Sequence, residues 1–120
     1  MSGALEKETD WIYRIFSRRI ISVRAKNEQI RKIAATDLST NLSFSIEVPE
    51  NVSLESVEVE KSYFASFKVY TTKNVKNIAP ELVEFFEVLD VDQPAEDFIK
   101  AYLIYPKHVK FELLEVEPVE

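Results

Sequence analysis

Apolar and polar side chains alternate one by one in three parts of the chain. These are residues 42–48, 56–72 and 108–116. A period of two is typical of strands that bury one face against a core. The middle segment is longer than most strands, so we expect a bend in it near Lys61–Ser62. The pattern therefore predicts three strands or more.

Three other segments show helical periodicity. Residues 4–17 carry apolar side chains at helical spacing, which predicts an amphipathic helix. A second helix is expected over 80–89, where Pro80 suits the first turn. A third is expected from Asp92, a suitable N-cap, to Leu103. Its inward side chains would be Phe98, Ile99, Tyr102 and Leu103.

Residues 18–36 allow two interpretations. A heptad seam through them fits one long helix. The other interpretation is a hairpin, with a strand over 19–26, a turn at Asn27–Glu28 and a second strand from Ile30. The β-branched side chains of the first half favour the hairpin, because such side chains fit strands better than helices.

The order of these elements predicts the fold class. Strands that are grouped, and do not alternate with helices, indicate an antiparallel sheet. We therefore expect one α+β domain over residues 1–120, with four or five antiparallel strands and the helices on one face of the sheet. A small β-barrel with peripheral helices is the alternative.

The composition excludes several kinds of site. The chain has no cysteine, one glycine and one histidine. Disulfides, thiolate or multi-histidine metal sites and glycine-rich phosphate loops therefore cannot be built. The acidic segment 90–97 departs from the calcium-loop template at Pro94, Ala95 and Ala101, and it suits the start of a helix. We predict a protein that is not an enzyme and that holds no metal or cofactor.

The formal net charge is −6, but the basic residues gather in the first third of the chain. All five arginines lie within residues 14–31. This window is a candidate contact for nucleic acid or for an acidic partner, because guanidinium groups bind phosphates and carboxylates bidentately. Its alternative role is to pair with the acidic C-terminal half inside the fold, which is the outcome we expect. The candidate contact residues are Arg14, Arg18, Arg19, Arg24, Lys26, Arg31 and Lys32.

A second set of candidate residues is aromatic. The alternation over 56–72 places Phe64, Lys68 and Tyr70 on the side opposite the core. Residues 61–70 resemble the aromatic strand of RNA-recognition motifs, although Ser62 stands in place of that motif's glycine; the resemblance implies stacking of bases on the exposed rings. Because Trp and Tyr are frequent anchors of protein interfaces, we take Trp11, Phe64, Lys68 and Tyr70 as a candidate interface.

Residues 30–39 resemble the first strand of SecB-type export chaperones. That strand reads Ile-x-x-Ile-x-x-x-Asp-Ile-Ser, and here it is matched by Ile30, Ile33, Asp37, Leu38 and Ser39. The glycine-rich hairpin of that family is absent, and a strand follows the helices here. The resemblance implies an oligomeric, acidic protein that holds other proteins.

These observations favour a non-enzymatic protein-binding module, such as an accessory subunit, an adaptor or a chaperone-like protein. We expect a protein partner, with a homo-oligomer possible. The alternative is a nucleic-acid-binding protein that uses residues 14–32 and the outward aromatics of 56–72. The polar start of the chain and the short apolar runs predict a cytoplasmic protein without a membrane segment. The abundance of Glu, Lys, Val and Ile is thermophile-like.

Overall fold

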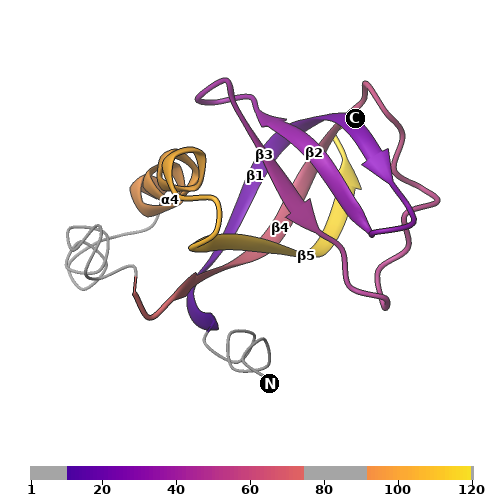
Figure 1. The fold of residues 1–120 in the computed structure, drawn as a ribbon. Helices are drawn as coiled ribbons and strands as arrows, with labels where there is room; N and C mark the ends of the chain where they lie inside the picture. The colour runs from indigo at the N-terminus through magenta and orange to yellow at the C-terminus, as the bar shows by residue number, and fades with distance from the viewer. Residues whose placement is uncertain (1–10, 75–91, 120) are drawn as a thin grey trace, which may run out of the picture.

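The computed structural model describes residues 11–74 and 92–119. In this part of the chain, five strands close into a barrel in the order β1-β2-β3-β5-β4 (Figure 1). Among the described residues, one helix lies between the last two strands in the chain. The elements are β1 (Trp11–Asn27), β2 (Lys32–Asp37), β3 (Leu42–Glu47), β4 (Ser62–Thr72), α4 (Asp92–Ile104) and β5 (Val109–Pro118).

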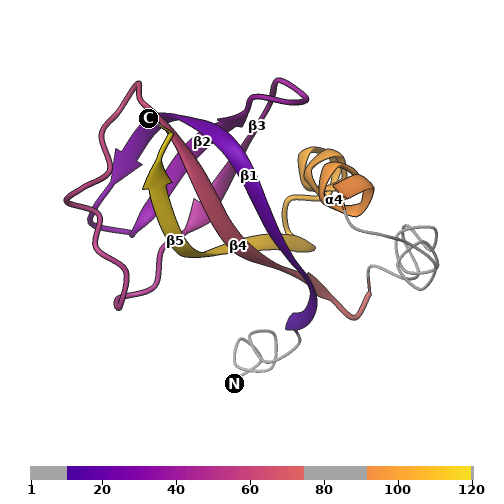
Figure 2. The same cartoon turned by 180° about the vertical axis from the view of Figure 1, so that it is seen from behind.

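The barrel closes because β1 is long enough to pair with two neighbours. Its first part, Trp11–Ser22, lies antiparallel to β4, and its second part, Ile21–Asn27, lies antiparallel to β2. Figure 2 shows β1 and β4 side by side as long curved strands, with β5 next to β4. The seam is between β3 and β5, which are parallel and are paired at Glu47 and Glu112.

The predicted α+β fold is wrong. The sheet is mixed and closed, so it has no single face for helices to cover, and the described residues contain one helix. The alternative expectation, a small barrel with peripheral helices, shares the closed sheet, and one peripheral helix lies within the described residues. The expected helix over 80–89 lies outside the described residues.

The predicted helix over 4–17 is wrong from Trp11 onward, where β1 begins. The helix-like spacing of Ile12, Ile15 and Phe16 has a local cause. A β-bulge lies between Tyr13 and Ile15, and the extra residue interrupts the two-residue alternation of the strand. Residues 4–10 of that prediction lie outside the described residues.

The hairpin interpretation of residues 18–36 is confirmed. The turn follows Asn27, whose side-chain oxygen accepts hydrogen bonds from the backbone N–H groups of Gln29 and Ile30. Two turn residues adopt the left-handed backbone conformation, Arg31 with a φ of 52° and Asn41 with a φ of 64°. Glycine often occupies such positions. The single glycine of the chain lies at position 3, far from both turns.

The remaining elements largely follow the alternation. The strands over 42–48 and 108–116 are confirmed. The strand predicted over 56–72 is confirmed only from Ser62, where β4 begins, because residues 56–61 belong to the loop before it. The helix from Asp92 is also confirmed; it packs against β3, β5 and β1. Of its predicted inward side chains, Phe98 and Ile99 are buried, whereas Leu103 is 49% exposed. No helix of the described segments has the length and apolar character needed to cross a membrane.

The core fills the inside of the barrel. Its centre is a cluster of rings from three strands and the helix, in which Phe111 lies 4.8 Å from Phe44, 5.6 Å from Phe67 and 5.5 Å from Tyr102, measured between centroids. The loop 48–61 adds the buried side chains of Leu54 and Val57.

Candidate interaction surface

The outer side of β1, β4 and β5 carries the four residues of the predicted interface. The register places Tyr13 opposite Tyr70, Phe16 opposite Lys68, and Ile20 opposite Phe64. Lys110 of β5 lies opposite Tyr70 on its other side. We call this surface the aromatic face. Its residues are Trp11, Tyr13, Phe16, Ile20, Phe64, Lys68, Tyr70 and Lys110.

Cations lie over the rings of the aromatic face. The Lys110 Nζ atom is 4.9 Å from the Trp11 ring centroid and 5.4 Å from that of Tyr70. The Lys68 Nζ atom is 5.8 Å from the Tyr13 ring centroid. The rings of Tyr13 and Tyr70 meet edge to face at 5.9 Å. These contacts link Trp11, Tyr70 and Tyr13 into one row, with the Lys110 ammonium near the rings of Trp11 and Tyr70 and the Lys68 ammonium over Tyr13.

Two carboxylates are paired with side chains on this side of the barrel, Glu117 at the Phe64 end of the face and Glu112 beside Tyr70. The Arg18 guanidinium lies 4.5 Å from the Phe64 ring centroid and forms an ion pair of 2.9 Å with Glu117. The Tyr70 hydroxyl donates to Glu112 at 3.1 Å. Burial and this bond to a carboxylate raise the pKa of Tyr70, so its hydroxyl stays protonated and acts as a donor.

The largest exposed apolar side chains of β1 belong to this face. Tyr13 is 51% exposed, Phe16 is 54% exposed and Ile20 is 39% exposed. None of these three residues was predicted to lie in an interface. The bulge gave the segment around Tyr13 and Phe16 a helical spacing, whereas Ile20 lies in the predicted strand over 19–26. Lys110 was not predicted either, although the alternation over 108–116 places that lysine on the outer side.

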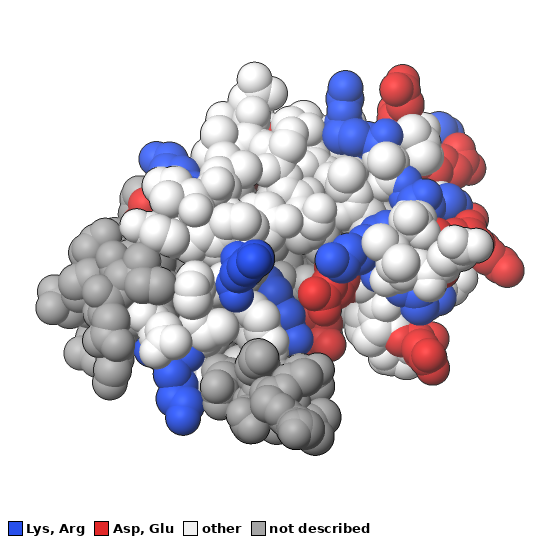
Figure 3. Space-filling model, viewed as in Figure 1, with Lys and Arg blue, Asp and Glu red and all other residues white. Residues whose placement is uncertain are grey.

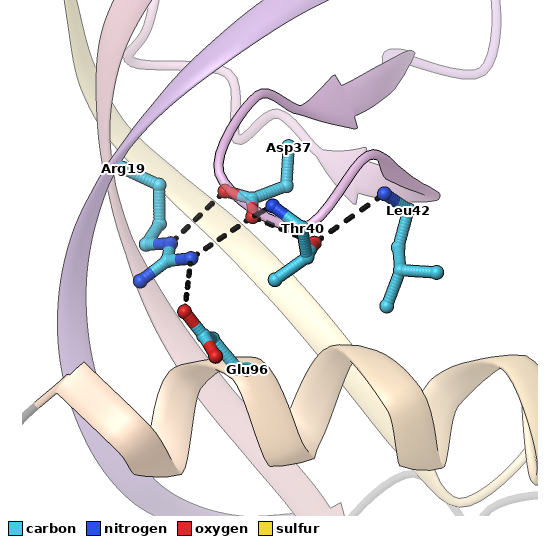
Figure 4. A network of polar contacts seen from close by, with 5 residues as sticks. All are labelled: Arg19, Asp37, Thr40, Leu42 and Glu96. Carbon is cyan, nitrogen blue, oxygen red and sulfur yellow. Dashed lines mark hydrogen bonds and ion pairs between the residues drawn. The ribbon is translucent and has the colours of Figure 1, made fainter.

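The residues of the arginine window do not form one surface, because they contact different parts of the fold. Arg19 is buried, and its guanidinium donates to both carboxylate oxygens of Asp37, at 3.0 and 2.9 Å. It also donates to Glu96 of α4 at 3.2 Å. Asp37 is fully buried and accepts two further bonds from Thr40, from its N–H at 3.0 Å and its hydroxyl at 2.8 Å. Figure 4 shows this network joining β1, the β2–β3 turn and α4.

The charge state of the network follows from these bonds. Burial alone would raise the pKa of Asp37, but the hydrogen bonds from Arg19 and Thr40 outweigh it, and the pKa lies below its ordinary value. The hydrogen bond to Asp37 likewise raises the pKa of Arg19 despite its burial. Both groups are therefore charged at neutral pH.

Two other members of the window hold the loop 48–61. Arg31 and Lys26 donate hydrogen bonds to main-chain carbonyl oxygens of this loop. The acceptors are Val48, Pro49 and Val52 for Arg31, and Leu54 and Val57 for Lys26.

The last members of the window are dispersed. Arg14 donates from Nε to the Thr71 hydroxyl at 2.8 Å, whereas Arg24 and Lys32 are exposed. Pairing with the C-terminal half is seen for Arg18, with Glu117, and for Arg19, with Glu96. The structure thus brings the aromatic candidates together and separates the basic ones.

Metal-ligating groups give no site in the described segments. Figure 3 shows acidic and basic side chains interspersed on the face viewed there, around a broad uncharged area. In residues 11–74 and 92–119, no group of three or more His, Asp or Glu side chains is placed to hold a metal ion. His108 contacts the Thr72 hydroxyl through Nδ1 at 2.7 Å, which joins the end of β4 to the start of β5.

Comparison of the chain with models of protein families, with curated proteins and with solved structures gives no match. The resemblance of residues 30–39 to SecB-type chaperones therefore stays a prediction from sequence.

Proposed function

We propose that the protein is a non-enzymatic protein-binding module that docks a partner on the aromatic face. One observation carries this proposal: Tyr13, Phe16 and Ile20 are exposed together on the outer side of β1. The barrel has a complete core without them. Large apolar side chains grouped on an otherwise polar surface are typical of interaction sites.

The electrostatics of the centre of the face support a protein partner. Arg18 is already paired with Glu117, and Glu112 already accepts the Tyr70 hydroxyl. Docking at Phe16 would therefore bury few charged groups that are not already paired. The cores of protein interfaces are likewise poor in charged residues. Such a module acts as an accessory subunit, an adaptor or a chaperone-like protein. A second copy of the chain can be the partner, and a cytoplasmic location remains the expectation.

The proposal predicts that Phe16→Glu abolishes partner binding. The affinity should fall ~30-fold or more, because a central aromatic anchor contributes at least ~2 kcal/mol and the new carboxylate would be desolvated. The test is affinity purification of the tagged full chain from its source cells, with mass spectrometry of the bound proteins. Light scattering on the purified chain measures whether the partner is a second copy.

Ile30→Glu is the matched control, since Ile30 is 60% exposed in the β1–β2 turn, outside the aromatic face. It should keep the partner that Phe16→Glu loses. A specific partner retained by Phe16→Glu, or lost equally by both folded variants, would refute the proposal.

A further inference from the structure

The Trp11 end of the aromatic face opens into a pocket of about 230 Å³. It lies beside the seam where parallel β3 and β5 are paired at Glu47 and Glu112. Its walls include the rings of Trp11 and Tyr102 and three lysines, Lys32, Lys107 and Lys110, against the single carboxylate of Glu47. In a chain with a net charge of −6, this is a local excess of positive charge.

The pocket continues the row of rings and ammonium groups described above. Lys110 belongs to both, because it lines the pocket and lies over Trp11 and Tyr70. Beyond Tyr70 come Tyr13 and Lys68. The hydroxyl of Tyr70 is held by Glu112, so that ring is oriented before any ligand arrives.

This arrangement matches one class of ligand. A row of flat rings with ammonium groups beside them suits a polymer that carries both flat rings and negative charges. Single-stranded nucleic acid has that chemistry, since its bases can stack on aromatic side chains and its phosphates can contact lysines. In a duplex the faces of the bases are stacked on one another and cannot reach the rings.

We propose that the Trp11 end of the aromatic face binds single-stranded nucleic acid, with a phosphate in the lysine pocket and bases on Tyr70 and Tyr13. This goes beyond the proposed protein docking around Phe16. It also relocates nucleic-acid binding from the arginines of the window, of which Arg19 and Arg31 are bonded inside the fold, to lysines of β4, β5 and the pocket. Lys32 is the one residue of the window that lines this pocket.

The chain offers a direct probe, because Trp11 is its only tryptophan. We expect a short oligothymidine to change the Trp11 emission in a saturable way. Binding should weaken with salt, with a slope of log affinity against log salt of roughly −2 to −3 if three or four phosphates are contacted. Inorganic phosphate and a duplex of the same length are the comparison ligands.

Variants locate the site by fluorescence anisotropy of a labelled oligothymidine. Lys110→Ala and Tyr70→Ala should each weaken binding roughly tenfold, from the loss of a phosphate contact and of a stacking ring. Lys61→Ala is the matched control, because Lys61 is an exposed lysine just before the other end of β4; it should keep the affinity within about twofold.

Several outcomes would overturn the inference. They are no binding of oligothymidine at millimolar protein, equal binding of the duplex, displacement by equimolar inorganic phosphate, or equal losses in Lys61→Ala and Lys110→Ala. The protein-docking proposal is separable from this one. Ile20→Glu, at the Phe64 end of the face, should lose the protein partner and keep oligothymidine binding. Lys110→Ala should keep the protein partner and bind oligothymidine more weakly.

Discussion

Replacing Asp37 with asparagine is expected to lower the free energy of unfolding by about 3–5 kcal/mol. The substitution keeps the size of the side chain but removes the charge that balances Arg19, whose side chain is 8% exposed. The amide nitrogen of asparagine would also face donors, because Arg19 and Thr40 both donate to this side chain. Urea denaturation followed by circular dichroism measures the loss.

The pH dependence of stability distinguishes this explanation from a packing defect. The folded pKa of Asp37 lies below its unfolded value of about 3.9. Its contribution is therefore fully present above that value, and it is lost as the pH falls through the folded pKa. The unfolding free energy of the native chain should drop more steeply than that of Asp37→Asn below about pH 4.

Glu96→Gln is the control for the same network. Glu96 contacts Arg19 from α4 but is 28% exposed, so losing its charge should cost no more than ~1 kcal/mol. If Asp37→Asn costs as little as Glu96→Gln, the Arg19–Asp37 pair does not hold β1 to the end of β2 as described.

Replacing Phe111 with alanine is expected to lower the free energy of unfolding by about 3–5 kcal/mol, because apolar burial is lost and a cavity is left behind. The Phe111 ring is 1% exposed and contacts the rings of Phe44, Phe67 and Tyr102, from two other strands and the helix. The neighbours are fixed in separate elements, so they can collapse into the space only in part. Thermal and chemical denaturation both measure the change.

Phe16→Ala is the matched control on the outside of the same barrel. Phe16 is 54% exposed, so its truncation should change the unfolding free energy by ~0.5 kcal/mol or less. Phe111→Leu keeps much of the side-chain volume. If Phe111→Ala does not fold, Phe111→Leu should still do so. Equal losses for Phe16→Ala and Phe111→Ala would mean that the inside and outside of the barrel are assigned wrongly.

Alternation made the inner and outer faces of β4 and β5 predictable. Tyr63, Phe67 and Val69 point inward on β4, and Phe64, Lys68 and Tyr70 lie on its other side, as the two-residue period requires. That is why three of the predicted interface residues came from this strand. Trp11 also lies on the aromatic face, but the helix predicted over 4–17 is a strand from Trp11 onward.

Barrel closure could not be predicted, because it depends on which strands pair and not on the pattern within each strand. The bulge after Tyr13 hid the first half of β1, and only the complete β1 can pair with both β2 and β4. The parallel pairing of β3 with β5 also joins segments that are distant in the chain.

The individual contacts of the basic residues likewise could not be predicted from the sequence pattern. Arg19 looks like one more surface charge in an arginine-rich window, yet it is buried against Asp37 and Glu96. Its partners lie 18 and 77 positions away. Arg31 and Lys26 bond to carbonyl oxygens, which carry no sequence signature at all.

The central claim is that the aromatic face is a protein-docking surface, and site-specific photo-cross-linking tests it most directly. A benzophenone-bearing phenylalanine analogue would be placed at Phe16 and, in a second variant, at Ile30, which is 60% exposed in a turn away from the face. After irradiation in the source cells, we predict one discrete cross-linked protein from position 16 and none from position 30. The same products from both positions, or none from position 16, would contradict the claim.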